Sequence, residues 1–419
     1  MENLGRHSVP GEATAAAVSL PDINTETYPF EIVQHLLDEA AYCNLYSAPR
    51  SAQSHSIVDP GAGENVVGFK ISETLHRFSV ALSPPSQAEG LRASNTVGES
   101  IASFEHRWML IPHDFAALPG KTPPPVCLDL SRSQRFVMLD GRCIFGDGSD
   151  GFEGFGTGVT YPATVNGQTL LLAAAVGNVM DGFGRFKGHE GTYVYCGTLS
   201  PRGFTGSFLL RVMDQAGTLR TESSLRSLRP IAKPEPGISY FVFRGQKRDH
   251  SQKTEYVKDQ AGEITGLLVS QQLRALDVDC GPDYRGEIRA SAQMGPVIGS
   301  MTARIAFNLL HPGAPGTRSS PIPFKSYNTY TFFDRDGKEI GAIEADGGEG
   351  RTFNLALKGA PGQQALRFGG FGPIVKGTGY FSGIQGLMTD NSVVGIAPHA
   401  LATFYVLRIN DPDGRFRVR

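Results

Sequence analysis

The chain has 419 residues and a net charge of −2, so it has no bulk electrostatic attraction to nucleic acid or to an anionic membrane surface. Its 51 glycines and 27 prolines are typical of many tight turns rather than of long helices. Five scattered cysteines without CxxC spacing indicate free thiols in a reducing compartment, and no apolar run has the length of a membrane span or a signal peptide. We therefore expect a soluble, cytoplasmic protein.

The first expected elements are a disordered tail over residues 1–28 and a helix over residues 29–47. The tail is polar and contains many small residues. In the helix, apolar residues recur at helical spacing; they are Phe30, Val33, Leu37, Ala40, Ala41 and Leu45. We expect this helix to cover a barrel end or the seam between two domains.

From about residue 64 onward the sequence predicts β-strands. Asp-Gly and Asn-Gly pairs separate short alternating runs, and both residue types tolerate the positive φ of tight turns. These pairs are at 140–141, 147–148, 150–151, 166–167, 181–182, 336–337 and 346–347. The expected strands are 101–111, 133–145, 168–176, 191–199, 205–214, 264–279, 298–310, 326–334, 338–345, 352–358, 364–369 and 400–410. Short strands with regular turns favour a sandwich or a closed barrel.

Several blocks of sequence occur twice, in the same order. Gly182–Gly191 matches Gly377–Gly386 at an offset of 195 (377 − 182), with all four glycines and the central phenylalanine aligned. The other blocks keep similar offsets: Phe208–Arg220 with Tyr405–Arg417, Phe136–Arg142 with Phe332–Lys338, Ile101–Ser103 with Ile298–Ser300, and Gly68–Leu75 with Gly266–Leu273. Such a repeat predicts two copies of one domain. We place the first, with its helix, at 29–228 and the second at 229–419, joined by a proline-containing linker over 221–237.

The stretch Phe368–Gly386, followed by Phe404–Arg408, resembles the allene oxide cyclase and dirigent protein superfamily. Those proteins carry a Gly-x-Gly-x-Phe-x-Gly-x-x-Gly motif late in the chain and then an aromatic-rich last strand. The first copy resembles them through Gly182–Gly191 and Phe208–Val212, so the likeness covers about the last third of each copy. It implies an eight-stranded antiparallel barrel with an apolar interior, and cofactor-free cyclisation, isomerisation or stereocontrol of coupling. We therefore expect an all-β chain of two tandem calycin-like barrels.

Other sites of known chemistry are not indicated. The ten histidines show no HxH or HExxH spacing, and there is no GxSxG nucleophile elbow. The run Gly120-Lys121-Thr122 lacks the first glycine of a phosphate-binding loop, and prolines follow it. Basic residues do not cluster with aromatic ones. We expect no cofactor, no metal, no nucleic acid and no membrane partner, and we expect the repeated glycines to be architectural.

The most informative polar cluster lies on the predicted strand 101–111. Alternation places Glu105 and Arg107 on one face and His106 and Trp108 on the other. The second copy keeps the arginine as Arg304 but has no polar or aromatic equivalent of the other three. This difference between the copies is a sign of specialisation. The alternative is a surface ion pair with His106 packed under Trp108.

Tyr193 and Tyr195 share a face at strand spacing. In a barrel, each would offer an O–H donor beside an apolar wall, which suits polarisation of a carbonyl or epoxide oxygen. The alternative is that they are aromatic residues at a barrel rim. The expected substrate contacts are Trp108, Phe136, Met138, Phe208 and Tyr330.

These observations predict a cofactor-independent cyclase or isomerase of specialised metabolism. It would close a ring in a flexible hydrophobic substrate inside a barrel cavity, with a pericyclic (Diels–Alder-type) step as one route. Arg107, Tyr193 or Tyr195 would supply a hydrogen bond, and Glu105 or His106 would move a proton. We expect the cavity in the first barrel, and a monomer with an internal pseudo-dimer or a homodimer. The alternatives are a non-catalytic carrier of a hydrophobic metabolite and a double barrel whose interiors are filled.

Overall fold

The computed structural model describes residues 41–48, 53–59, 65–86, 90–115, 117, 119–124, 126–165, 168–200, 203–214, 218–219, 235–246, 254–262, 264–276, 294–307, 322–356, 364–395 and 401–418. These residues are almost entirely β-strand, which confirms the expected all-β class. Their helices η2 (Gly184–Phe186) and η3 (Gly379–Phe381) are single 3-10 turns, and within the described ranges none is long and apolar enough to cross a membrane.

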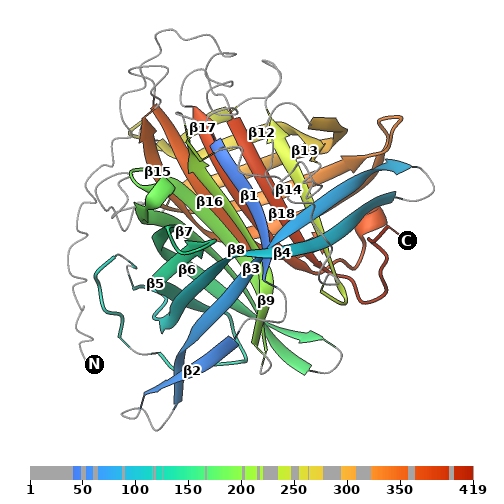
Figure 1. The fold of residues 1–419 in the computed structure, drawn as a ribbon. Coiled ribbons are helices and arrows are strands. Elements are labelled where there is room, and N and C mark those ends of the chain that lie inside the picture. Colours follow the sequence, from blue (N-terminus) through green and yellow to red (C-terminus); the bar gives the residue numbers. More distant parts are fainter. Residues whose placement is uncertain are drawn as a thin grey trace, which may run out of the picture.

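The first sheet closes into an eight-stranded antiparallel barrel (Figure 1). Its order is β1-β9-β8-β7-β6-β5-β4-β3-β2, and β1 pairs with β3 as well as with β9, which leaves β2 outside the closed ring. The strands are β1 (Ala41–Ala48), β2 (Gln53–Asp59), β3 (Asn65–Ser86), β4 (Gly90–Ile111), β5 (Gln134–Phe145), β6 (Asp150–Val165), β7 (Gln168–Phe183), β8 (Gly191–Ser200) and β9 (Gly203–Met213).

The second sheet repeats this arrangement. Its order is β10-β18-β17-β16-β15-β14-β13-β12-β11, and β10 pairs with both β18 and β12. The strands are β10 (Ile238–Gln246), β11 (Thr254–Lys258), β12 (Ile264–Leu276), β13 (Met294–Phe307), β14 (Ile322–Phe333), β15 (Glu339–Ala356), β16 (Gln364–Gly377), β17 (Gly386–Gly395) and β18 (Leu401–Asn410). Each strand of the first sheet thus has a counterpart at the same place in the second.

The repeated glycine block forms the same corner in both sheets. The residue before η2, Phe183, has φ −127° and ψ 163°, and its counterpart Thr378 has φ −125° and ψ 162°. Gly184 and Gly379 follow with φ 59° and 55°, a left-handed conformation that favours glycine. A Cβ on Gly184 would lie 2.2 Å from the Ser149 carbonyl oxygen. The block is architectural, as expected.

One sequence match of the repeat does not correspond in space. Asp140-Gly141 lies inside β5, where the pairing register with β4 shifts and Asp140 has a φ of 53°. Asp336-Gly337 instead belongs to the turn after β14, and the matching turn after β5 is at 146–149. The motif misleads because Asp-Gly suits positive φ in a bulge as well as in a turn. The expected turns at 150–151, 181–182 and 346–347 also lie within strands, and 166–167 is outside the described residues.

The helix expected over residues 29–47 is wrong for its described part, because residues 41–48 form β1. Leu45 belongs to the cluster between the barrels and Tyr46 to the interior of the first barrel. A strand buried on both faces is apolar at successive positions, and such a run also satisfies helical spacing. Residues 1–40, which include the expected tail, and linker residues 221–234 lie outside the described residues.

Several strands were missing from the sequence-based prediction or differ from it. The missed ones are β2, β3, β6, β10, β11 and β17, and the two expected strands at 338–345 and 352–358 are one irregular strand, β15. Glycine-rich β6 and polar β17 lack a run of apolar residues. Their hydrogen bonds to neighbouring strands hold them in the sheet, and a sequence pattern does not report those bonds.

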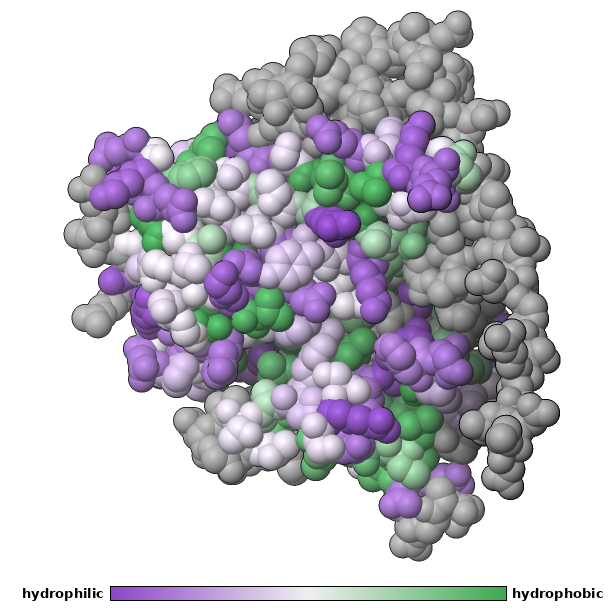
Figure 2. Space-filling model, turned by 180° about the vertical axis from the view of Figure 1, so that it is seen from behind, coloured by the Kyte–Doolittle hydropathy of each residue, from purple (hydrophilic) through white to green (hydrophobic). Residues whose placement is uncertain are grey.

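The barrels lie side by side and pack through outer faces of β7 and β8 against β16 and β17 (Figure 1). Val194 and Cys196 belong to this seam, whereas Tyr193 and Tyr195 point into the first barrel. Arg367 crosses the seam, with Nη1 donating to Thr192 Oγ1 at 2.8 Å. On the face shown in Figure 2, apolar residues form separate patches among polar ones. Most large apolar side chains are therefore enclosed in the barrels and the seam.

Candidate functional site

Strand β4 carries the expected polar cluster, and its alternation is as predicted. Burial alternates along residues 102–108, with His106 and Trp108 buried in the first barrel and Glu105 and Arg107 exposed on its outer face. Arg107 pairs with Asp140 at 2.8 Å, and both side chains are largely exposed. Such a pair contributes little to stability. The expected roles of Glu105 and Arg107 inside a barrel are therefore not supported by their positions.

A buried carboxylate that the sequence analysis missed faces His106. Glu73 lies on β3, and its Oε1 is 2.8 Å from His106 Nε2, with both side chains fully buried. The Tyr195 hydroxyl, from β8 on another side of the barrel, donates to the same oxygen. The sequence feature that could have revealed Glu73 is its place as an acidic residue in an otherwise apolar alternating series, Phe69, Ile71, Glu73 and Leu75. We name Glu73, His106 and Tyr195 the polar trio.

Aromatic rings surround the polar trio. The His106 ring centroid lies 4.6 Å from that of Phe104 and 5.7 Å from that of Trp108. Trp108 in turn stacks on Phe136 at 4.3 Å. The trio therefore lies in a dry, apolar interior, in which electrostatic interactions and hydrogen bonds are stronger than in water.

Three buried atoms beside the trio have no hydrogen-bond partner among the residues that the structure describes: Glu73 Oε2, His106 Nδ1 and Trp108 Nε1. With Nε2–H directed at Glu73, a neutral His106 ring carries its lone pair on Nδ1. Trp108 offers only a donor. One acceptor and one donor thus stand two residues apart on the inward face of β4, and buried polar atoms without partners are uncommon.

Both tyrosines of β8 are hydrogen-bond donors rather than bases. Burial raises the pKa of Tyr193, whose hydroxyl donates to the Met138 sulfur at 3.4 Å. Burial, and secondly the Glu73 carboxylate, raise the pKa of Tyr195. Both groups therefore remain phenols at neutral pH.

The expected substrate contacts fall into two separate groups. Trp108, Phe136, Met138 and Phe208 all lie in the interior cluster of the first barrel, together with Tyr193 and Tyr195. Tyr330 lies in the second barrel instead, where its ring packs against those of Phe243 and Tyr405. The fold does not bring Tyr330 to the other four residues.

Small structural features close the ends of the first barrel. At one end the Leu128 N–H donates to the Val66 oxygen at 2.7 Å, and Val126 and Leu128 pack against the interior cluster. At the other end Phe186 of η2 stacks on Phe145 at 5.0 Å. The segment 126–128 is thus held over its end by this backbone hydrogen bond, by a hydrogen bond from Gln134 Nε2 to the Cys127 oxygen at 2.8 Å, and by two partly buried side chains.

The second barrel has different residues at the corresponding positions. Glu73 pairs with Phe104 across β3–β4, and Gln271 pairs with Met301 across β12–β13, so Gln271 stands where Glu73 does. The same pairing registers place four other residues of the second barrel at positions of the first: Ala303 at that of His106, Asp390 at that of Tyr195, Tyr405 at that of Phe208 and Ser326 at that of Met138. Ala303 and Ser326 are smaller than their counterparts, and a cavity of about 30 Å³ lies beside them. We expected the ligand cavity in the first barrel, whereas this one is in the second.

Within the described part of the chain, no group of three or more His, Cys, Asp or Glu residues could hold a metal ion. Comparisons of the chain with protein-family models, with curated proteins and with solved structures found no match.

Proposed function

We propose that the first barrel is a cofactor-free isomerase or cyclase of specialised metabolism, which moves a proton within a flexible hydrophobic substrate. The observation that carries the proposal is the buried Glu73–His106 pair, which leaves His106 Nδ1 without a partner in an apolar interior. A candidate base within hydrogen-bond reach of a second group that orients it is a geometric feature of catalytic sites. The resemblance to allene oxide cyclases and dirigent proteins adds to this proposal.

The chemistry follows from the two unpartnered atoms on β4. His106 Nδ1 accepts a proton from a carbon next to a carbonyl group, and Trp108 Nε1–H donates to the oxygen that becomes negatively charged. The imidazolium, whose proton exchanges with solvent, then delivers a proton to another carbon, which gives an isomer of equal mass in H₂O. For ring closure, the carbanion attacks an electrophilic carbon within the substrate, and the imidazolium protonates the oxygen released there. A positioned acid–base group contributes about 10²–10⁴ in rate.

Glu73 and Tyr195 act as positioning residues. A carboxylate on Nε2 fixes the ring tautomer and orientation and stabilises the imidazolium that forms after proton transfer. The Tyr195 hydroxyl holds the Glu73 oxygen that faces His106. The rings of Phe104, Phe136 and Phe208 would fold the substrate, and orientation of this kind lowers barriers by up to about 7–11 kcal/mol.

Substrate entry requires one barrel end to open. The segment 126–128 is the suitable cover, because only a few contacts hold it among the described residues: a hydrogen bond to the Val66 oxygen, one from Gln134 Nε2, and the partly buried Val126 and Leu128. A hydrophobic substrate that displaces these side chains reaches Trp108 and Phe136 before His106.

A carrier of a hydrophobic metabolite is the alternative, and it needs no interior acid or base. To separate the two, purified protein is incubated with an apolar extract of its source cells, and masses are followed by chromatography. We expect one compound to be replaced by another of equal mass, and His106→Gln to abolish this conversion. Tyr193→Phe is the matched control, since among the described residues the Tyr193 hydroxyl bonds only the Met138 sulfur, and conversion should persist. A compound retained but unchanged by the wild-type protein would support the carrier.

A further inference from the structure

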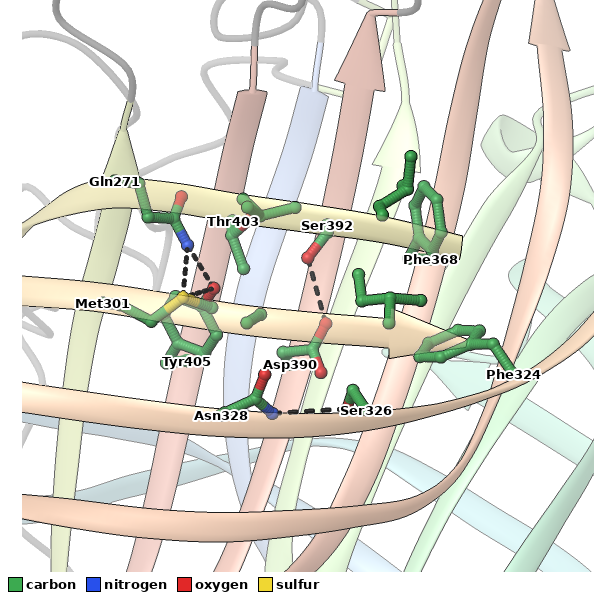
Figure 3. Close-up of a pocket in the computed structure, with 14 residues that line it drawn as sticks. Gln271, Met301, Phe324, Ser326, Asn328, Phe368, Asp390, Ser392, Thr403 and Tyr405 are labelled. Atoms are coloured by element: carbon green, nitrogen blue, oxygen red, sulfur yellow. Dashed lines mark hydrogen bonds between the residues drawn. The ribbon is translucent and has the colours of Figure 1, made fainter. Parts of the chain in front are cut away.

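The cavity of the second barrel has polar and apolar regions (Figure 3). Figure 3 shows Gln271, Met301 and Tyr405 at one side, Asp390 and Ser392 in the middle, and Phe324 and Phe368 at the other side. The volume of about 30 Å³ admits about two water molecules or a ligand of similar size, because one water needs about 10–15 Å³ on this measure.

The middle of the cavity contains a carboxylate without a counter-charge. Asp390, on β17, is 8% exposed, and among the described residues it accepts one hydrogen bond, from Ser392 Oγ to Oδ2 at 3.0 Å. No lysine, arginine or histidine among the described residues forms an ion pair with it. Burial raises the pKa of Asp390 to about 6, and burial also raises the pKa of the neighbouring phenols of Tyr330 and Tyr405. Near neutral pH the carboxylate is therefore mostly charged and unpaired, which costs stability.

The other polar groups of the cavity add acceptors. Gln271 directs Nε2 to the Tyr405 hydroxyl and the Met301 sulfur, and its Oε1 has no partner among the described residues although the side chain is buried. Asn328 directs Nδ2 to Ser326 Oγ at 3.3 Å, which leaves its carbonyl oxygen as an acceptor. An occupant that supplies several donors and a positive charge would satisfy this lining.

The remaining wall is apolar. Phe324 and Phe368 form an edge-to-face pair at 5.6 Å, and Leu267 and Ile305 complete this side. The lining therefore changes from acceptors to hydrocarbon over the length of the cavity, which is the distribution expected for an amphipathic ligand.

We propose that the second barrel is a binding site for a small primary alkylamine, with its ammonium group on Asp390 and its alkyl chain between Leu267, Phe324 and Phe368. The ammonium group supplies three donors and the missing charge, whereas an alcohol supplies one donor and no charge. A carboxylic acid would add a second negative charge beside Asp390. The site is distinct from the polar trio, because it lies in the other barrel.

The test is calorimetric titration of the full chain with ethylamine, whose three heavy atoms match the cavity volume, and, as its neutral counterpart, ethanol. We expect the amine to bind at least tenfold more tightly than the alcohol at pH 7.5, and Asp390→Asn to weaken amine binding at least tenfold. Asp140→Asn makes the same chemical change at an exposed site and should leave binding unchanged. Equal binding of amine and alcohol, or undiminished binding by Asp390→Asn, would overturn the proposal.

A second variant keeps the test decisive should Asp390→Asn not fold. Ala303→Leu fills the cavity and leaves Asp390 in place, and circular dichroism checks its fold. We expect it to lose amine binding at least tenfold, while ethylamine binding that persists would show that the ammonium group binds elsewhere. His106→Gln lies in the first barrel, so this titration and the conversion assay fail independently.

Discussion

The two barrels share a strand order and a glycine corner, yet their interiors have opposite characters. In the first, a carboxylate from β3 receives hydrogen bonds from two sides and is surrounded by aromatic rings. In the second, the carboxylate comes from β17, receives one serine hydroxyl and borders a cavity. The equivalent pairs are Glu73 and Gln271, His106 and Ala303, and Tyr195 and Asp390.

This difference shows which parts of a duplicated barrel are free to change. Glycines at the corner are fixed by the backbone, since a Cβ on Gly182 or Gly377 would lie about 2 Å from a carbonyl oxygen. Inward side chains are constrained only by the volume that they share. One copy can therefore exchange a tyrosine for an aspartate when a neighbouring histidine becomes alanine. Fold and chemistry change independently in this molecule.

The largest expected effect tests how tightly the first barrel is packed. Trp108→Ala removes a fully buried ring that stacks on Phe136, and we expect a loss of about 3–5 kcal/mol in the free energy of unfolding. Its counterpart Ile305 is only partly buried, so Ile305→Ala should cost less than half as much. Denaturant titration followed by circular dichroism measures both, since Trp108 is the only tryptophan. Equal losses would show that the two interiors are packed alike.

The next effect tests the unpaired charge of the second barrel. Burial raises the pKa of Asp390 to about 6 from an ordinary value of 3.8. A carboxyl group whose pKa is raised by folding destabilises the folded protein when it ionises. Stability is therefore at its full value below about pH 4 and decreases as the pH rises to about 6. The cost is on the order of 3 kcal/mol. The difference in unfolding free energy between wild type and Asp390→Asn should change by this amount between pH 4 and pH 7, and a flat difference would contradict the assignment.

A smaller effect compares two tyrosines that share a face of β8. Tyr195→Phe removes a donor to the Glu73 carboxylate, and such charge-assisted bonds contribute about 1.5–3 kcal/mol. Tyr193→Phe removes only a weak bond to the Met138 sulfur, so we expect less than about 0.5 kcal/mol. Thermal and denaturant unfolding of the two variants gives the difference. If Tyr193→Phe costs as much as Tyr195→Phe, the polar trio does not hold the barrel as described.

The sequence was informative where local patterns decide the structure. Period-two alternation correctly separated His106 and Trp108 from Glu105 and Arg107, but it did not show which face points inward. The repeated glycines indicated the duplicated corner. The expected helix failed because the closing strand β1 is buried on both faces. The match of Asp140-Gly141 to Asp336-Gly337 failed because one pair is a bulge and the other a turn.

The key partners could not be read from the sequence, because they depend on pairing register. Glu73 meets His106 only through the register of β3 against β4, which shifts further along at Leu75 and His76. Asp390 lies on a strand whose polar sequence hid it from the strand prediction. A one-residue slip would turn either side chain to the opposite face of its sheet. Which barrel contains this cavity likewise depends on which inward side chains face each other across the barrel.

The most direct test of the account is solvent isotope incorporation in the proposed reaction. Wild-type protein is incubated with the apolar extract in H₂O and in D₂O, and products are compared by mass. Because His106 exchanges its proton with solvent when the site opens, we predict a product of unchanged mass in H₂O that gains one mass unit in D₂O. We also predict that the product disappears with His106→Gln. Conversion without deuterium uptake that survives His106→Gln would contradict proton transfer in the first barrel.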